Sequence, residues 1–542
     1  MIEEDKDSAL LKNITNNKDN INKNKVSSKA SSNSFIHKVL AKTAMHFFGP
    51  TANPELPRKN EIININHFLT SLHDFNQDDV NFIKKAFVFA DKSHLGQYRQ
   101  SGEPYITHPL AVAEICVAWK LGKFAICAAF LHDVMEDQDV GKNELIAEFG
   151  IEVADLVEGL TKLTNSEFNS KEDERAANFD RLLASSIKDH KVLLVKIADR
   201  LHNMRTLKYM KSTKQRIIAK ETQEIYAPLA KRLGLHQAYN ELQDLSFLYY
   251  YPWRYEILRK ALDTQYESAN DFIEKVCNNI NINLAKYNIL ATCQGYIKTP
   301  FIIYNKLRSK KQSYKGFRLK DMQDLLSFEI IVGQKIDCYT AMGVLHSIFK
   351  PKPGRFKDYI SLPKRNGYRG LHTNLIDNHG YAFGVQIRTK RMQKIAESGI
   401  VAAFDDKEIS ENNLDNSKPD ELLNSLQELR NQANDFNELL HYSKIDLSSD
   451  EIVVFDVNGN PVLVPRYSTA LDFAYHISYM VGNKTKSIEI NGAKCSFNQP
   501  LKNGDLVKIK TSENVIVHKD WLKIVKTSRA KIAIQHYLRT NN

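Results

Sequence analysis

The chain has 542 residues, and at roughly 150 residues per domain this length predicts about three or four domains and excludes a single small binding module. Apolar residues make up 42% and charged residues 26% of the chain, a balance typical of soluble globular proteins, so fibrous and wholly disordered classes are excluded. The formal net charge of +11 and the isoelectric point near 9.0 favour an anionic partner such as a nucleotide, RNA or the ribosome.

The sequence carries no sign of export or membrane insertion. Its six cysteines lie far apart without a CxxC pair, which predicts reduced thiols. The longest apolar run, Phe124 to Leu131, is far shorter than the roughly 20 residues of a membrane span. The N-terminus begins with acidic residues in place of a basic segment followed by an apolar one. We therefore expect a cytoplasmic protein.

The chain begins with a leader and a helical domain. Residues 1–60 are rich in Asn, Lys and Ser, so they cannot bury enough apolar surface to offset the entropy of ordering, and we expect a disordered leader. Residues 75–270 show apolar side chains at three-and-four spacing with few Gly or Pro breaks, which predicts an all-α domain. An example of this spacing is the set Val80, Ile83, Phe87 and Ala90.

The helical domain contains candidate metal ligands. Two imidazoles and two carboxylates come from His108, His132, Asp133 and Asp199. Mixed nitrogen and oxygen ligands suit Mn²⁺ or a similar divalent ion, and such an ion can acidify a water into a nucleophile for a phosphoryl centre. Each residue alone is ordinary, because a single His or Asp is more often a core residue or part of a surface ion pair. Their joint occurrence favours one metal site.

Helical spacing supports this interpretation. His132 and Glu136 are four residues apart and share one helical face, while Asp133 and Asp137 share the neighbouring face, so we expect ligands and acid/base carboxylates to meet in one cleft. A second helix repeats the pattern. Its polar residues at i, i+4 and i+7 offer a ligand and two groups that can read a base edge: Asp199, Asn203 and Thr206.

The segments that carry these residues resemble the hydrolase domain of the RelA/SpoT homologue family, the long alarmone enzymes that make and degrade (p)ppGpp. The matching segments are residues 96–104, 105–109, 131–137 and 196–206. The resemblance implies an HD-type metal-dependent phosphohydrolase domain in which Mn²⁺ is held by His108, His132, Asp133 and Asp199. It implies that Glu136 and Asp137 orient or deprotonate the attacking water. One departure is Gln138, where the family usually has Thr.

The same resemblance implies a nucleotide-binding set in this domain. Arg99 would stack against guanine, and Ser101, Asn203 and Thr206 would contact the nucleotide. All of these residue types are present at the matching positions of the chain.

The texture of the sequence changes over residues 290–405, where β-branched runs alternate with helical stretches and predict a separate α+β domain. Residues 298–320 hold eight Lys or Arg and no acidic residue. Such a cluster of positive charge could bind a triphosphate, although a solvated helix face would show the same composition. The segments 354–359, 366–373 and 385–389 resemble the alarmone synthetase domain of the same family, which implies a nucleotidyltransferase-like fold.

This second domain looks like a synthetase that has lost its activity. Pyrophosphoryl transfer from ATP needs carboxylates that bind Mg²⁺ and activate a hydroxyl. Asp324 matches the first of these carboxylates in the family, but Gly384 stands at the position of the second. Tyr296 and Glu329 stand at two positions where the family has arginine. Ala403-Phe404 stands where the family has a His-Trp pair. We therefore expect Mg²⁺ chemistry only if the domain proves active, and a role as scaffold, sensor or regulator otherwise.

The remaining residues of the vestigial synthetase site are Lys298, Arg355, Lys357, Tyr368 and His372. Tyr368 matches a tyrosine that stacks on guanine in the family. Arg355 and Lys357 belong to the basic form of a signature that accompanies members retaining hydrolase.

Three segments complete the chain. Residues 406–448 are acidic and Asn-rich with leucines at helical spacing, which indicates a helical linker. Over residues 450–512, the Asn458-Gly459 turn between two apolar runs predicts a hairpin of a small β-grasp domain, which resembles the TGS module of the family. In the family this module senses tRNA, ribosome or carrier-protein partners, although it could equally be a packing module. Residues 513–542 are expected to form a C-terminal helical tail, beyond which family members continue into an ACT-type regulatory domain.

The sequence thus predicts a Mn²⁺-dependent (p)ppGpp 3′-pyrophosphohydrolase that releases pyrophosphate and regenerates GDP or GTP. One alternative is a bifunctional enzyme that keeps GTP diphosphokinase activity. Another is a nucleotide- or ribosome-responsive binding protein with vestigial catalysis. A third is an HD-type phosphohydrolase acting on nucleoside triphosphates or cyclic dinucleotides.

Overall fold

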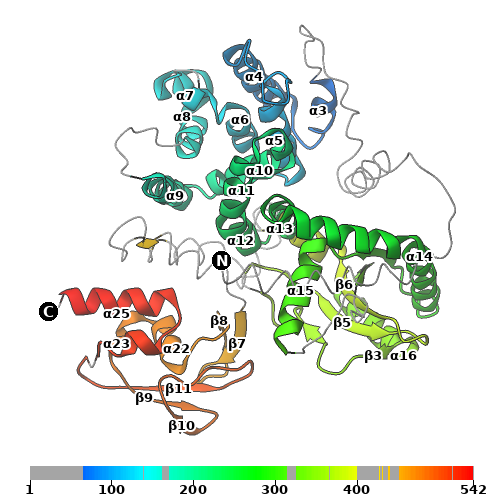
Figure 1. The fold of residues 1–542 in the computed structure, drawn as a ribbon, viewed down its shortest axis with the longest axis vertical. Coiled ribbons are helices and arrows are strands. Elements are labelled where there is room, and N and C mark those ends of the chain that lie inside the picture. The colour runs from blue at the N-terminus through cyan, green and yellow to red at the C-terminus, as the bar shows by residue number, and fades with distance from the viewer. Residues whose placement is uncertain are drawn as a thin grey trace.

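The structure is a computed structural model that describes most of the chain between residues 65 and 540. The described residues are 65–137, 140–161, 170–313, 325–364, 366–399, 451–515 and 517–540, with residues 427, 430, 438 and 439 of the linker. The expected leader, Gln138, Asp324 and Ala403-Phe404 lie outside them. Figure 1 shows a helical part in blue to green, an α+β part in green to yellow, and a small orange and red part that contains the C-terminus.

The expected all-α domain is confirmed. Its helices are α3 (Asn66–Thr70), α4 (Gln77–Ser93), α5 (Thr107–Ala118), α6 (Lys123–Leu131), α7 (Val134–Asp137), α8 (Lys142–Leu160), α9 (Lys171–Lys188), α10 (Lys191–Arg205), η1 (Leu207–Tyr209), α11 (Ser212–Glu221), η2 (Thr222–Tyr226), α12 (Ala227–Arg232) and α13 (His236–Tyr250).

Helix α6 is the centre of this domain. It is the long apolar run of the sequence, and every residue from Ala125 to Leu131 is buried. Phe130 receives edge contacts from Phe68 at 5.3 Å and Phe87 at 5.6 Å between ring centroids, the geometry that aromatic quadrupoles favour. Because α6 is packed on all sides, the polar residues that follow it are held in a fixed position.

The long helix α14 (Pro252–Ala285) leads into the α+β domain, beside whose sheet it runs in Figure 1. The strand order is β1-β2-β6-β5-β3, and β4 pairs with β5. The strands are β1 (Thr292–Ile297), β2 (Leu326–Val332), β3 (Lys350–Pro351), β4 (Lys357–Asp358), β5 (Leu371–Ile376) and β6 (Ala382–Thr389), and the helices are α15 (Pro300–Ser313), α16 (Lys335–Ile348) and α17 (Lys390–Ser398). Strands β2 and β6 are parallel, with Ser327 opposite Gly384.

The β-grasp domain is also confirmed. It contains β7 (Glu451–Phe455), β8 (Pro461–Pro465), α22 (Ala470–Ile477), α23 (Tyr479–Asn483), β9 (Thr485–Ile490), β10 (Ala493–Cys495) and β11 (Val507–Thr511). The predicted β7–β8 hairpin forms, but its turn is longer than the two residues expected from Asn458-Gly459. Phe455 pairs with Pro461, which leaves a five-residue loop. Only Gly459 adopts a positive φ in it, and the Asp456 carboxylate accepts the backbone N–H groups of Asn458 and Asn460.

The end of the chain packs against the β-grasp domain as α24 (Trp521–Ile524) and α25 (Ser528–Thr540). The buried Asp472 carboxylate accepts the backbone N–H groups of Lys526 and Thr527, as well as that of Thr469 at the start of α22. One side chain therefore caps α22 and fixes the C-terminal segment.

The helical and α+β domains meet at a backbone junction. The turn at Gly234 lies against Gly399 and the loop at Asn366, so close that a Cβ on Gly399 would lie 2.3 Å from the carbonyl oxygen of Leu233. The Asn366 side-chain amide donates to the Lys231 carbonyl at 2.9 Å. Arg232 forms an ion pair with Glu451 of the β-grasp domain. The last residues of α12 and the turn that follows it thus contact both other domains.

Candidate metal centre

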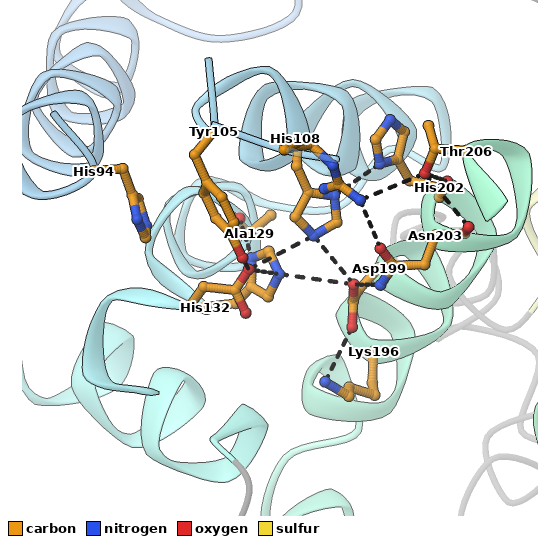
Figure 2. A network of polar contacts seen from close by, with 12 residues as sticks. His94, Tyr105, His108, Ala129, His132, Lys196, Asp199, His202, Asn203 and Thr206 are labelled. Carbon is orange, nitrogen blue, oxygen red and sulfur yellow. Dashed lines mark hydrogen bonds and ion pairs between the residues drawn. The ribbon is translucent and has the colours of Figure 1, made fainter. Parts of the chain in front are cut away.

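Three helices deliver the four predicted ligands. His108 lies in the first turn of α5, His132 and Asp133 follow the buried end of α6, and Asp199 lies in the middle of α10. Figure 2 shows His108, His132 and Asp199 converging between these helices. Their candidate ligand atoms all lie within 4.8 Å of one another, and all three residues are buried.

The distances place Asp133 beside this set. His108 Nε2 lies 3.3 Å from Asp199 Oδ1 and 3.6 Å from Asp133 Oδ2. His132 Nε2 lies 3.2 Å from Asp133 Oδ2 and 3.8 Å from Asp199 Oδ1. Asp133 thus contacts both imidazoles, whereas the set whose ligand atoms all lie within 4.8 Å of one another consists of His108, His132 and Asp199.

The electrostatics of the site favour ionised carboxylates. Burial opposes ionisation of Asp133 and Asp199, but nearby cations outweigh it and lower both pKa values. For Asp133 the main partner is His132, and for Asp199 it is the ammonium of Lys196, 3.0 Å away. Burial likewise opposes charge on His132, yet the two carboxylates raise its pKa to about 8. Both carboxylates are therefore ionised and can serve as oxygen ligands for a cation.

A divalent metal fits this donor set. His132 Nε2 is buried and has no hydrogen-bond partner among the described residues, an arrangement that normally carries a cost unless another group uses the nitrogen. Its Nδ1 lies 2.8 Å from the Ala129 carbonyl oxygen and donates a proton to it, so Nε2 is the nitrogen that can bind an ion once it has lost its own proton. Two neutral imidazoles and two carboxylates are ligands that Mn²⁺ and similar ions accept.

Each predicted ligand has a partner outside the cluster, and sequence reasoning missed most of these partners. Tyr105 donates its hydroxyl to Asp133 Oδ2 at 2.7 Å, and His202 Nδ1 lies 2.7 Å from His108 Nδ1. Asn203 donates to Asp199 Oδ1 at 2.5 Å, and Lys196 pairs with the other oxygen. Spacing could have indicated two of them, because Lys196 and His202 lie three residues before and after Asp199 on one helix.

The acidic pair Glu136 and Asp137 lies on α7, not on a continuation of α6 as the spacing argument assumed. The chain turns at His132 and Asp133, and α7 begins only at Val134. Glu136 is half-buried, and its backbone N–H donates to the Asp133 carbonyl at 3.2 Å. The Asp137 side chain lies outside the described part of the chain. The pair follows the ligands directly, but the shared helical faces do not exist.

Hydrogen bonds join three of the four predicted nucleotide-binding residues, Arg99, Asn203 and Thr206. Arg99 donates to Asn203 Oδ1 at 3.1 Å and to Thr206 Oγ1 at 3.4 Å, which joins two segments that are far apart in sequence. Ser101 donates to the carboxylate of Glu103 at 3.0 Å. Since Asn203 also contacts Asp199, one amide connects this polar set to the metal ligands.

In the α+β domain the predicted synthetase residues fall into two groups. Arg355 and Lys357 are exposed, the latter on β4. Tyr368 is only 4% exposed, and its hydroxyl contacts His372 and accepts from Arg388 at 2.6 Å. A Cβ at Gly384 would lie 3.7 Å from Lys298 Nζ, so the missing side chain would have reached that lysine. Asp324 lies outside the described residues.

Comparisons with known proteins agree with this arrangement. Family models match the chain as an HD domain over residues 86–236, a region found in RelA / SpoT proteins over 295–410, and a TGS domain over 452–511. The chain is 38% identical over 481 residues to a guanosine-3′,5′-bis(diphosphate) 3′-pyrophosphohydrolase of Vibrio cholerae, covering 88% of this chain and 68% of the relative.

Two further relatives carry other names. A GTP pyrophosphokinase of Myxococcus xanthus is 41% identical, with 85% of this chain and 61% of the relative covered. A bifunctional (p)ppGpp synthase/hydrolase SpoT of Escherichia coli is 38% identical, with 85% and 65% covered. The chain thus spans about two thirds of the length of these curated relatives. Among the described residues, no helix combines the length and apolar character needed to cross a bilayer.

Proposed function

Because this chain belongs to the RelA/SpoT family, we propose that it hydrolyses the alarmone (p)ppGpp, releasing pyrophosphate from the 3′ position and regenerating GDP or GTP. The observation that carries the proposal is the buried meeting of His108, His132 and Asp199, with Asp133 beside them, in the domain that matches the HD family.

The residues have separate roles in this reaction. The four ligands would hold a divalent ion, which we propose to be Mn²⁺ and which would supply Lewis acidity to a phosphate oxygen or a water. Glu136 and Asp137 follow the ligands on α7 and would orient the attacking water and take its proton. Arg99 would stack on guanine, and Asn203, Thr206 and Ser101 would contact the nucleotide. Arg99 must then exchange its present hydrogen bonds for contacts with the base.

We further propose that the α+β domain does not transfer pyrophosphate from ATP. Gly384 offers no carboxylate beside Lys298, and the anionic Glu329 pairs with Arg388 close to Tyr368. A cation already neutralised by an internal carboxylate contributes little attraction for a phosphate. These features favour a hydrolase over a bifunctional enzyme.

We expect the chain to work in the cytoplasm, where its free thiols would stay reduced. The β-grasp domain, which matches the TGS model, would bind a partner such as tRNA, the ribosome or a carrier protein.

Product analysis tests the proposed reaction. The protein is incubated with ppGpp labelled in its 3′ pyrophosphate, with Mn²⁺ present. We expect labelled pyrophosphate and unlabelled GDP in equal amounts. Release of labelled orthophosphate would indicate a different phosphohydrolase, and hydrolysis of GTP or of cyclic dinucleotides in preference to ppGpp would reject the substrate.

A further inference from the structure

The imidazole of His202 stands directly behind a predicted metal ligand. Its Nδ1 lies 2.7 Å from Nδ1 of His108, and the two rings are tilted by 30° with centroids 4.9 Å apart. Figure 2 shows His202 on the side of His108 that faces away from His132 and Asp199. The His108 ring thus has one nitrogen toward the ligand cluster and the other toward His202.

Two facing ring nitrogens at this distance share one proton. Two N–H groups would clash and two bare nitrogens would repel, so one imidazole donates and the other accepts. A neutral His108 can bind a cation through Nε2 only if its proton is on Nδ1, in which case His202 Nδ1 must be the acceptor. We propose that His202 is a positioning residue of the metal centre, which holds His108 in the tautomer and ring orientation that leave Nε2 free for a cation. This inference rests on the proposed metal-dependent hydrolase.

The second imidazole ligand, His132, is also held by a hydrogen bond at Nδ1, but its acceptor is a backbone carbonyl. His132 Nδ1 lies 2.8 Å from the Ala129 carbonyl, the kind of backbone acceptor that commonly fixes metal-binding histidines. Because that acceptor is backbone, substitution of Ala129 cannot remove it. The acceptor behind His108 is a side chain, so its contribution can be measured directly.

The groups around His202 favour a neutral imidazole as the acceptor for the His108 proton. The ring comes from α10, which also supplies Asp199, so one rigid helix sets both the ligand and the group behind His108. Lys196 and Asn203 already occupy both oxygens of Asp199, and Tyr105 contacts Asp133. A neutral imidazole therefore completes the set of partners without adding a third carboxylate to a site that already holds two.

Calorimetric titration of the full-length protein with Mn²⁺ tests the inference without reference to activity. His202→Ala should raise the Mn²⁺ dissociation constant about 10- to 100-fold, the usual effect of losing such a partner. His202→Asn places an amide near the position of Nδ1 and should restore most of the affinity. If His202→Ala proves unstable, His202→Leu fills the space without offering a nitrogen. His236→Ala, which removes a half-buried imidazole on α13 that belongs to the domain junction, is the control and should bind Mn²⁺ like wild type.

The outcomes separate the two proposals. Folded His202→Ala or His202→Leu with wild-type Mn²⁺ affinity would overturn the role of His202, as would a folded His202→Asn that binds as weakly as His202→Ala. A wild-type protein that binds Mn²⁺ but leaves ppGpp intact would overturn the proposed hydrolase, while the comparison of dissociation constants would still decide the role of His202. In hydrolysis assays the variants should need more Mn²⁺ for half-maximal rate and approach the wild-type kcat at saturating Mn²⁺.

Discussion

Glu329 on β2 and Arg388 on β6 form an ion pair in the interior of the α+β domain, with side chains only 14% and 8% exposed. Arg388 also donates to the hydroxyl of Tyr368 and contacts Gln386 and Gln393. The arginine of a motif that resembles a synthetase is therefore fully engaged inside the protein. This network has consequences for both stability and activity.

Removing one partner of this pair should destabilise the domain. Glu329→Ala leaves a buried guanidinium without its counter-charge, and we expect a loss of about 3 kcal/mol in the free energy of unfolding. Thermal melts followed by circular dichroism would measure it. Asp263→Ala breaks an exposed Arg259–Asp263 pair on α14 and should cost at most about 0.5 kcal/mol. Equal effects of the two substitutions would contradict a buried, structurally important pair.

The same network predicts that the α+β domain makes no alarmone. With ATP, GDP and Mg²⁺, the purified protein should give no (p)ppGpp in a nucleotide separation assay. Gly384→Glu should not restore synthesis, because the new carboxylate would approach Lys298 while Glu329 still neutralises Arg388. Clear product formation that Asp324→Ala abolishes would show instead that the domain is an active synthetase.

The domain junction contains a histidine whose protonation should weaken the protein in acid. His236 is half-buried, and desolvation together with Lys364, Arg388 and Lys231 lowers its pKa to about 3. An unfolded chain takes up this proton near pH 6.5, so stability is fully present above that pH and falls by about 1.4 kcal/mol per pH unit below it. The apparent melting temperature of His236→Gln should therefore fall less steeply between pH 6.5 and 5. His73→Gln, at an exposed site, is the control, and identical slopes for His236→Gln and wild type would refute the prediction.

Contact between the two larger domains should depend on Gly399. An alanine there would adopt a φ of +60° and place its Cβ against the backbone at Leu233 and Gly234. Gly380→Ala shares a positive φ but has open space around it, so it isolates the conformational cost, about 1–2 kcal/mol, from the clash. We expect Gly399→Ala to lower the melting temperature well beyond Gly380→Ala and to speed proteolysis between the domains. Equal behaviour of the two variants would argue against a tight junction.

Much of the fold and of the site followed from local patterns. The helical period of residues 75–270 predicted the all-α domain, and the types and order of His108, His132, Asp133 and Asp199 predicted a cluster that the structure brings together. The break between α6 and α7 could not be predicted, because the residue spacing of this segment is helical throughout. Partners such as Tyr105 were missed because tertiary packing brings distant segments together.

The ion pair between Glu329 and Arg388 in the α+β domain could not be predicted from the sequence either. Glu329 was recognised as a departure from a basic residue, but its partner Arg388 lies 59 positions away. Only the parallel alignment of β2 and β6 makes them neighbours.

The central claim is that the buried ligand cluster is the active centre of a (p)ppGpp hydrolase. The most direct measurement is the rate of ppGpp hydrolysis as a function of Mn²⁺ for wild type, Asp199→Asn and Asp155→Asn, the last replacing an exposed carboxylate on α8. We expect hydrolysis by wild type and Asp155→Asn that chelation abolishes and Mn²⁺ restores, and a rate lower by at least about 100-fold in Asp199→Asn. A wild-type protein that leaves ppGpp intact under saturating Mn²⁺, or an Asp199→Asn variant as active as wild type, would contradict the claim.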